Sequence, residues 1–275
     1  MPELPEVETI RRQLQRTIKG ATIKGVTVRY GKKIAPRSST FVKMLTGKKV
    51  LAVDRRAKIL WIKLSGGLNL FVHLKMTGRL LLKKKGERPS KHTHVVFELS
   101  GGRELHWEDI RKFGWLKLMP DDEAKKFLEK QSFGPEPISK KFTRPVLSLC
   151  LRAHPKAAIK PLLMTQSCVA GIGNIYATEA LWMAKIHPLT KVEKISDAQI
   201  RLLYSSVVSV LKQAIPARGS STDAYLDIYG KEGAFVPKLK AYGREGKKCL
   251  RCRSILKKIR VGGRGTTICT KCQKR

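Results

Sequence analysis

The chain has 275 residues, of which 57 are Lys or Arg and 21 are Asp or Glu, so its formal net charge is +36. A charge of this size opposes folding through self-repulsion and favours a polyanionic partner; nucleic acid is the first expectation, and a membrane surface or a ribosome is the alternative. No apolar run approaches the roughly 20 residues of a membrane span, and the acidic start is unlike a signal peptide. Six cysteines are too few for a secreted disulfide scaffold. We therefore expect the protein to reside in a reducing cytoplasm.

The first predicted element is an amphipathic helix over residues 5–18. Pro5 stands at its start, and Val7, Ile10 and Leu14 fall on one helical face. From residue 21 to 120 the pattern changes to short β-type runs separated by Gly, Asn or Ser. Close spacing without helices between the runs predicts an antiparallel sandwich or barrel.

The second half of the chain has a different pattern. Residues 133–145 are rich in proline and predict a linker, and residues 146–215 carry helical periodicity, with Ser196 and Asp197 as a helix start. Residues 216–245 are rich in Gly, Ser and Tyr and predict a mobile loop. We therefore expect a β domain at 1–132, a linker at 133–145, a helical domain at 146–239 and a small metal module at 240–275.

Four cysteines near the end of the chain form two C-x2-C pairs separated by 16 residues: Cys249, Cys252, Cys269 and Cys272. This spacing predicts one tetrahedral, structural Zn²⁺; disulfides or a redox pair are the alternatives. Cys150 and Cys168 stand apart from any such pattern, and we interpret them as small buried apolar residues.

Two glycine-rich segments have features of phosphate sites. Gly262, Gly263 and Arg264 fall at the tip of a predicted β-hairpin within the cysteine module, where the backbone can approach a phosphate closely and the arginine can bind it; a solvated turn arginine is the alternative. Residues 169–174 precede a helix that Asn174 can cap, and this segment predicts an anion site at the helix start. A GxG pattern is also common in ordinary turns, but the nearby lysines 156 and 160 favour the phosphate interpretation.

The start of the chain has the composition of a nucleophilic site. Removal of Met1 would leave Pro2 with a free secondary amine, whose pKa of roughly 8 keeps a useful fraction unprotonated at neutral pH. Attack of this amine on a sugar carbon gives a cationic iminium, which favours elimination at the neighbouring carbon. Glu3 and Glu6 supply carboxylates beside it. The alternative is an ordinary terminus in which Pro5 opens a helix and the acidic residues complement the helix dipole.

Taken together, the motifs of this chain resemble those of the bacterial formamidopyrimidine-DNA glycosylase family. The resemblance rests on PELPEVET at the start, RRAK (55–58), HLKMTG (73–78), KHTHV (91–95), DIRKFG (109–114), FGPEP (133–137), GIGNIYATE (171–179) and the four terminal cysteines. It covers essentially the whole chain, with the motifs in the family's order and spacing.

The resemblance implies a fold and an activity. The fold is α+β with two domains: an N-terminal antiparallel β-sandwich with flanking helices, and a C-terminal helix-two-turn-helix domain with a zinc-finger β-hairpin held by four cysteines. The activity is that of a bifunctional DNA glycosylase and AP lyase of base excision repair. Such an enzyme excises 8-oxoguanine and formamidopyrimidines from duplex DNA and cleaves the abasic site by β,δ-elimination. We expect a monomer that acts on damaged double-stranded DNA in the bacterial cytoplasm and reaches the nucleoid through DNA.

The resemblance also implies catalytic roles. Pro2 is the nucleophile at C1′, Glu3 the general acid and base at the sugar, and Glu6 a supporting carboxylate. Lys58 corresponds to a residue that contacts phosphate and transfers a proton in β-elimination. Arg264 corresponds to the arginine that binds phosphate and serves δ-elimination.

Further residues are implied as contacts to DNA. The expected DNA ligands are His73, His92, Arg111, Lys156, Lys160 and Asn174. Met76, Arg111 and Phe113 match the family's intercalating wedge, which fills the stack when a base is flipped out; core packing is the alternative for the apolar pair. His92 and His94 lie in a pattern that also suggests a metal site, but no carboxylate or cysteine pattern accompanies them.

Two features depart from the family's pattern, and two other functions remain open. The family often has paired glycines before its Ser/Thr-rich lid loop, whereas residues 217–222 contain only Gly219; this places the mobility of the loop and its lesion preference in question. The charge of +36 is high for the family and suggests either tight nonspecific DNA binding or a high-salt or nucleotide-rich setting. The endonuclease VIII-like branch is a close alternative, although its start typically reads PEGPE rather than PELPE. A noncatalytic zinc-ribbon protein that binds nucleic acid is the alternative from another class.

Overall fold

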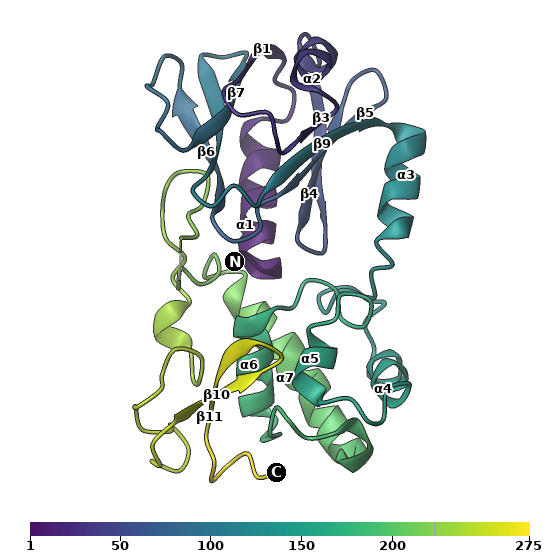
Figure 1. Cartoon of the computed structure of the whole chain (residues 1–275), viewed down its shortest axis with the longest axis vertical. Coiled ribbons are helices and arrows are strands. Elements are labelled where there is room, and N and C mark those ends of the chain that lie inside the picture. The colour runs from purple at the N-terminus through teal and green to yellow at the C-terminus, as the bar shows by residue number, and fades with distance from the viewer. Residues whose placement is uncertain (223) are drawn as a thin grey trace. The chain divides into compact units, whose positions relative to one another are not determined.

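The structure is a computed structural model that describes residues 1–222 and 224–275 (Figure 1). By their contacts these residues form two compact units. The first contains Met1–Lys130 and Ala217–Ala234, and the second contains Gln131–Pro216 and Phe235–Arg275. The four-part division made from the sequence stays a prediction; in the structure, residues 217–234 return to the first unit.

The first unit contains two β-sheets. One is antiparallel with the order β1–β7–β8–β6 and consists of β1 (Ile23–Val28), β6 (Gly78–Lys84), β7 (Thr93–Leu99) and β8 (Arg103–Asp109). The other has the order β2–β9–β5–β4–β3 and consists of β2 (Ile34–Ala35), β3 (Val50–Arg56), β4 (Ile59–Leu64), β5 (Leu68–His73) and β9 (Trp115–Pro120). Only the β2–β9 pair is parallel. The predicted antiparallel sandwich is confirmed.

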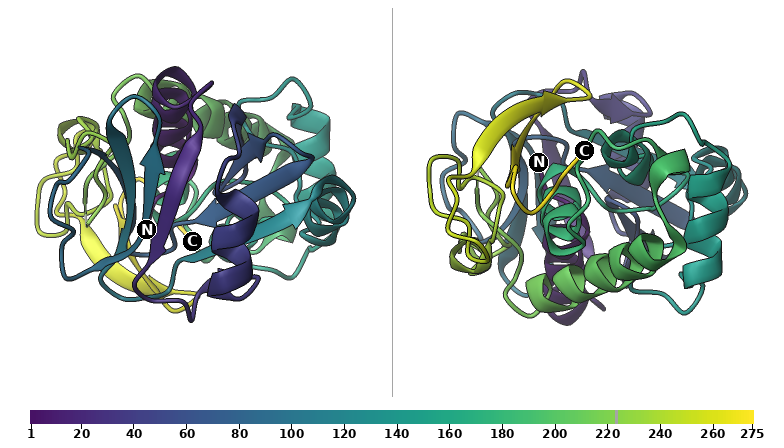
Figure 2. Two further views of the ribbon diagram at one scale, coloured as in Figure 1. Left: turned by 90° about the horizontal axis from the view of Figure 1, so that it is seen from above. Right: turned by 90° about the horizontal axis from the view of Figure 1, so that it is seen from below.

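Helix α1 (Leu4–Thr17) confirms the first predicted element and packs along β3 in the first unit (Figure 1). Its apolar side chains Val7, Ile10 and Leu14 are buried in the core of the sandwich, whose β1, β6, β7 and β8 side is seen in the left view of Figure 2. This packing fixes the amino end of α1 against the sheets, and with it the residues that precede the helix.

The resemblance implied flanking helices in this unit, but the sequence pattern did not locate two of them, α2 (Ser38–Leu45) and α3 (Asp121–Lys130). Helix α2 is only two turns long, so its buried Phe41 and Leu45 give too short a pattern to separate a helix from a strand. Helix α3 is mostly charged, and its apolar stripe is limited to Ala124, Phe127 and Leu128, of which only Ala124 is fully buried.

The second unit is helical and ends in a hairpin. Its elements are α4 (Arg144–Arg152), α5 (Ile159–Leu163), α6 (Asn174–Met183), the 3₁₀ turns Val192–Lys194 and Val236–Lys238, α7 (Asp197–Ala214), β10 (Lys257–Val261) and β11 (Arg264–Ile268). The right view of Figure 2 shows the long helix α7 and the β10–β11 hairpin in yellow. Ser196 caps α7 in a capping box with Gln199, which confirms the predicted helix start. Among the described residues, no helix is long and apolar enough to cross a membrane.

The interpretation of Cys150 and Cys168 as isolated residues is wrong. The structure joins them in a disulfide with a Cα–Cα distance of 5.7 Å, between α4 and the turn that precedes α6. The 18-residue separation matches no disulfide or metal motif, so only the fold brings the two sulfurs together.

Candidate active site and nucleic-acid interface

The amino end of α1 concentrates two buried carboxylates beside Pro2. Glu3 is the N-cap residue of the helix, and both Glu3 and Glu6 are at most 2% exposed. The Glu6 carboxylate accepts hydrogen bonds from the Glu3 N–H at 2.8 Å and from the Ser220 N–H at 2.7 Å. Glu6 therefore caps the helix, which was the alternative interpretation from the sequence. It also connects the start of the chain to residues 217–222.

Gly219 is the one glycine of the predicted lid, and its position requires glycine. Its φ is +76°, and a Cβ there would lie 2.3 Å from the Glu6 Oε1 atom. On its other side the backbone meets Gly233, where a Cβ would lie 2.3 Å from the Gly219 carbonyl oxygen. A glycine is thus retained where the chain passes over the Glu6 carboxylate.

The segment predicted as a mobile loop is anchored to the first unit over its described residues 217–222 and 224–234. The buried Asp227 carboxylate accepts from Gln13 of α1 at 2.9 Å and from the Lys231 N–H at 2.9 Å. Strand β6 contributes the Leu82 N–H to the Ile228 carbonyl and the Arg79 guanidinium to the Ala224 carbonyl. The composition indicated a loop, but it did not show these fixed points.

Tyr225 adds a neutral, buried group at the same place. Its hydroxyl lies 3.5 Å from the Glu6 carbonyl oxygen. Burial raises the pKa of the phenol, and the nearby carboxylates of Glu6 and Asp227 raise it further. Tyr225 therefore stays protonated across the physiological range.

Lys58 lies in the two-residue turn between β3 and β4 and is almost fully buried. The preceding Arg55 donates to the Ala57 carbonyl at 2.8 Å and pairs with Glu8 of α1 at 3.1 Å. Burial by itself would raise the pKa of the Glu8 carboxyl, but hydrogen bonds from Arg11 and Arg12 and the charge of Arg55 lower it below its usual value. Glu8 is thus ionised and fixes the RRAK turn to the helix that bears Glu3.

Two histidines of the predicted DNA-binding set lie in the first unit. His73 Nδ1 accepts a hydrogen bond from the Lys75 N–H at 3.0 Å, so the proton of the neutral ring resides on Nε2. Burial lowers the pKa of His73 to about 3, with further lowering by the charges of Lys75 and Lys58. His73 is therefore a neutral donor, close enough to Lys58 to sense its charge. His92 is partly exposed and donates its N–H to the Ser90 hydroxyl.

The three predicted wedge residues occupy two turns of the first unit. Met76 is partly exposed in the turn between β5 and β6. Arg111 and Phe113 lie between β8 and β9, where the guanidinium stands 4.7 Å from the centre of the aromatic ring. Phe113 is 48% exposed, so core packing does not explain it.

In the second unit, the burial of Lys160 differs from what we expected of a phosphate ligand. Its side chain is fully buried, and its ammonium donates to Asn174 Oδ1 and to the Thr266 hydroxyl, both at 2.6 Å. Because the charge is enclosed by these partners, Lys160 is placed to connect α5, α6 and β11. The exposed Lys156 keeps the predicted position on the surface.

The sequence predicted that Asn174 caps α6, and this prediction is wrong. The N-cap is Gly173, and Asn174 is the first helical residue. Its Oδ1 atom is occupied by Lys160, and its Nδ2 donates to the Gly265 carbonyl at 3.1 Å. The exposed Arg264 precedes that glycine at the tip of the hairpin, where Gly262 and Gly263 have φ of +54° and +75°. The amide thus attaches the Arg264 tip to α6.

Sequence reasoning missed two residues that shape this unit. Gln166 donates to the carbonyls of Met164 and Ile172 and accepts from the Gly171 N–H at 2.8 Å, which closes the turn before α6. Glu179 of α6 accepts three backbone N–H groups, from residues 240 to 242, each at 2.8 Å. Burial raises the pKa of Glu179 although these bonds oppose the shift. The sequence signal for Glu179 was its place as the lone acidic residue in the otherwise uncharged helix NIYATEALWM.

The four terminal cysteines form a group suited to one Zn²⁺. All four sulfurs lie within 4.8 Å of one another, close to the spacing that Zn–S bonds of about 2.3 Å produce around one ion. Trp182 of α6 packs against the cluster, and the Arg251 guanidinium lies 3.8 Å from the centre of its ring and donates to its carbonyl. The residues fit a closed structural metal site that supports the hairpin.

Three family models match consecutive parts of the chain. The Formamidopyrimidine-DNA glycosylase N-terminal domain matches residues 1–116, the Formamidopyrimidine-DNA glycosylase H2TH domain matches residues 133–225, and the zinc finger found in FPG and IleRS matches residues 246–275.

Relatives and solved structures match over the full length. A formamidopyrimidine-DNA glycosylase of Pelotomaculum thermopropionicum is 43% identical over 275 residues, which cover 100% of this chain and 99% of that protein. The Lactococcus lactis Fpg (MutM) in complex with DNA containing N7-benzyl-Fapy-dG has a TM-score of 0.93 and 37% identity, with both chains covered completely. A MutM structure with DNA containing carbocyclic 8-oxo-G has a TM-score of 0.93 at 36% identity, again over both whole chains.

Proposed function

The chain belongs to the formamidopyrimidine-DNA glycosylase family, and we propose that it excises oxidised purines from duplex DNA and then cleaves the abasic strand. The substrates are 8-oxoguanine and formamidopyrimidines, and the cleavage is a β,δ-elimination. The modified bases in the complexes of its structural relatives, N7-benzyl-Fapy-dG and carbocyclic 8-oxo-G, support this substrate class.

The chemistry begins at Pro2 once Met1 has been removed. The secondary amine attacks C1′ as the bond to the base breaks, and the product is an iminium that joins Pro2 to the sugar. Glu3, the neighbouring residue, exchanges protons with the sugar. Glu6 holds the backbone N–H groups of Glu3 and Ser220 and so keeps this end of the chain in place.

The elimination steps use cations and neutral donors. Lys58 contacts a phosphate and transfers the proton in β-elimination, while His73 offers its Nε2–H to a phosphate without adding charge. Arg264 binds phosphate and serves δ-elimination. Filling the gap that the extruded base leaves in the duplex falls to Met76 and to the preformed pair of Arg111 and Phe113.

The remaining roles concern binding and location. His92, Lys156 and Asn174 contact the DNA, and one structural zinc on the four cysteines holds the hairpin that carries Arg264. The enzyme acts as a monomer. Since its substrate is chromosomal DNA, we place it in the bacterial cytoplasm, associated with the nucleoid through DNA.

The observation that carries this proposal is the buried pair Glu3 and Glu6 directly beside Pro2. Burying two carboxylates is costly; helix capping accounts for part of it, and the place of Glu3 next to Pro2 also suits proton exchange at the sugar. The test is borohydride trapping on a duplex with a single 8-oxoguanine. We expect a covalent adduct with the wild-type chain and a strongly reduced yield with a Pro2→Gly variant that still binds the duplex, because the substitution replaces the secondary amine with a primary one.

Pro5→Ala is the matched control, because it changes the other proline of the first turn without touching the terminal amine. It should form the adduct at a rate within about threefold of wild type. Absence of an adduct on 8-oxoguanine, on an oxidised pyrimidine and on a plain abasic site would leave the noncatalytic zinc-ribbon function standing. An adduct on the oxidised pyrimidine alone would favour the endonuclease VIII-like alternative.

A further inference from the structure

Asp109, the last residue of β8, is a fully buried carboxylate that the chemistry above does not use. Its Oδ1 atom accepts from the Thr77 hydroxyl at 2.5 Å and from the Arg111 N–H at 3.2 Å. Its Oδ2 atom accepts from the Gly114 N–H at 2.6 Å. One side chain thus holds three donors, which come from two separate turns.

These two turns carry the wedge. Thr77 directly follows Met76 in the turn between β5 and β6, and Gly114 directly follows Phe113 in the turn between β8 and β9. The Thr77 hydroxyl also accepts from the Arg111 N–H at 3.0 Å, so the turns are joined to each other as well as to Asp109. The spacing of the wedge side chains therefore depends on this carboxylate.

The packing around Gly114 leaves little freedom for the second turn. A Cβ at Gly114 would lie 3.0 Å from the His73 carbonyl oxygen, 3.1 Å from the Asp109 Oδ2 atom and 3.3 Å from the Trp107 ring. The backbone therefore passes tightly between β5 and β8 and reaches the carboxylate without an intervening side chain. The exposed Phe113 and Arg111 emerge from a rigid base and are already stacked.

Only a carboxylate satisfies all three donors. An amide at this position has one oxygen and one NH₂ group, so in either orientation the NH₂ group faces a backbone N–H, of Gly114 or of Arg111. At least one turn then loses its anchor while the side-chain volume stays the same. Asp109→Asn should for this reason alter the positions of the two turns more than the packing around residue 109.

We propose that Asp109 is a positioning residue for base extrusion: its carboxylate sets the two wedge turns in register so that Met76, Arg111 and Phe113 enter the duplex together. This inference rests on the proposed function, since it assumes that these three side chains fill the stack. A wedge that is already assembled loses less freedom on binding, which is why a rigid base benefits the step.

The test compares two activities of the full-length protein loaded with zinc. One is single-turnover excision of 8-oxoguanine from a duplex, which needs the wedge. The other is strand cleavage at an abasic site in a single-stranded oligonucleotide, which has no opposite base and no stack to fill. We expect Asp109→Asn to lower the ratio of duplex excision to single-strand cleavage by about tenfold or more, with single-strand cleavage within about twofold of wild type. In parallel, 2-aminopurine beside the lesion should show a slower fluorescence rise on binding.

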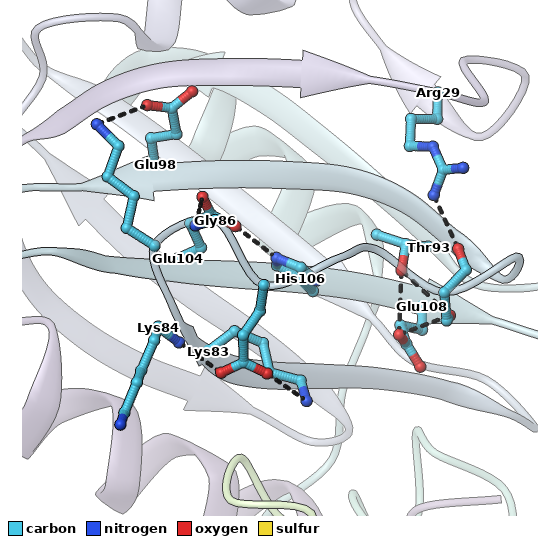
Figure 3. Close-up of polar contacts among 12 residues, drawn as sticks. Arg29, Lys83, Lys84, Gly86, Thr93, Glu98, Glu104, His106 and Glu108 are labelled. Carbon is cyan, nitrogen blue, oxygen red and sulfur yellow. Dashed lines mark hydrogen bonds and ion pairs between the residues drawn. The ribbon is translucent and has the colours of Figure 1, made fainter.

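Glu104→Gln is the matched control, because Glu104 is a buried carboxylate at the other end of the same strand. Its partners are His106 at 2.8 Å and the Gly86 N–H at 3.0 Å, in the polar cluster of Figure 3. We expect this variant to keep the wild-type ratio even where it lowers the melting temperature. A ratio that falls equally in Glu104→Gln and Asp109→Asn would overturn the proposal, because the effect would then be one of general stability.

Two further variants separate the possible failures. If Asp109→Asn does not fold, Thr77→Val removes one donor to the carboxylate, and the ratio should fall by about threefold or more; an unchanged ratio overturns the proposal. The double variant Arg111→Ala with Phe113→Ala tests the proposed wedge itself. A wild-type ratio in that double variant contradicts the wedge, whereas a lowered ratio there combined with an unchanged ratio in Asp109→Asn contradicts only the role of Asp109.

Discussion

The two units of the molecule differ in their balance of charge. The first unit contains 32 Lys and Arg residues and 16 Asp and Glu residues, whereas the second contains 25 and 5. The first buries carboxylates that hold backbone N–H groups and cations, namely Glu3, Glu6, Glu8, Glu104, Asp109 and Asp227. The second buries two of its five carboxylates, Glu136 and Glu179, and encloses a fully buried lysine, Lys160, between Asn174 and Thr266.

The difference shows where the net charge of +36 originates and what it serves. In the first unit, negative charge is taken into the interior, where it fixes the start of α1 and the wedge turns. In the second unit little negative charge opposes the cations, and covalent, metal and buried-lysine links hold their frame together. Substitutions that remove each link of the second unit, and one that removes a neutral group of the first, should therefore have separable effects.

The largest effect is expected from loss of the metal. A structural zinc contributes on the order of 10 kcal/mol to a small module, so Cys269→Ser should lose zinc and weaken binding to an abasic duplex by at least about 100-fold. Zinc content per chain and fluorescence anisotropy measure the two quantities. Cys150→Ala is the control and should retain zinc, because Cys150 is not one of the four clustered cysteines. Full zinc occupancy in Cys269→Ser would contradict the predicted four-cysteine site.

The disulfide is the next link of the second unit. A bond that closes a loop of this length contributes about 3 kcal/mol, so a double Cys150→Ala and Cys168→Ala variant should lose that much free energy of unfolding and show a lower urea midpoint. The double variant avoids reductants, which would also affect the zinc thiolates. Mass spectrometry after alkylation of the denatured wild type should show both cysteines protected; alkylation of both without reductant would refute the bond.

The pair of lysines 160 and 156 separates a buried cation from an exposed one. Lys160→Met leaves Asn174 and Thr266 without their donor and should lower the free energy of unfolding by about 2 kcal/mol, with the salt dependence of DNA binding unchanged. Lys156→Met should leave stability unchanged and reduce the slope of log K against log salt by about 1. A smaller salt slope in Lys160→Met would restore the prediction made from the sequence, that this lysine binds phosphate directly.

The smallest effect concerns His73 in the first unit. Its pKa is about 3 in the folded chain against roughly 6.5 in the unfolded chain. Between these values the unfolded state binds the extra proton, so stability is lost as the pH falls below about 6.5 and is unaffected above it. Wild type should lose about 1 kcal/mol more than His73→Gln between about pH 6 and pH 5. Urea titrations at the two pH values measure these losses, and His154→Gln, which changes an exposed histidine, is the control. If wild type and His73→Gln lose the same free energy of unfolding, the His73 side chain is exposed to water.

Much of the fold could be predicted from the sequence, because it rests on patterns that local chemistry imposes. Apolar periodicity indicated α1, Ser196 and Asp197 indicated the start of α7, and the two C-x2-C pairs indicated the metal group. Helices α2 and α3 were not located from the sequence, since one has only two turns and the other has a stripe of only three apolar residues.

The site could be predicted by residue type but not by contact. Pro2, Glu3, Lys58 and Arg264 follow from motifs, and their proposed roles still depend on the experiments above. The buried state of Lys160, the disulfide and the hub at Asp109 all depend on partners far along the chain. Thr266 is 106 residues from Lys160, and Thr77 is 32 residues from Asp109. A single sequence carries no signal of such pairings.

In the proposed reaction the amine of Pro2 forms the covalent bond to the sugar. Digestion of the borohydride-trapped complex and mass-spectrometric sequencing of the cross-linked peptide identify the attached residue. We expect a modified peptide that begins at Pro2, lacks Met1 and carries the sugar remnant on the proline nitrogen. Attachment at Lys58 or any other lysine, with an unmodified amino terminus, would contradict this expectation.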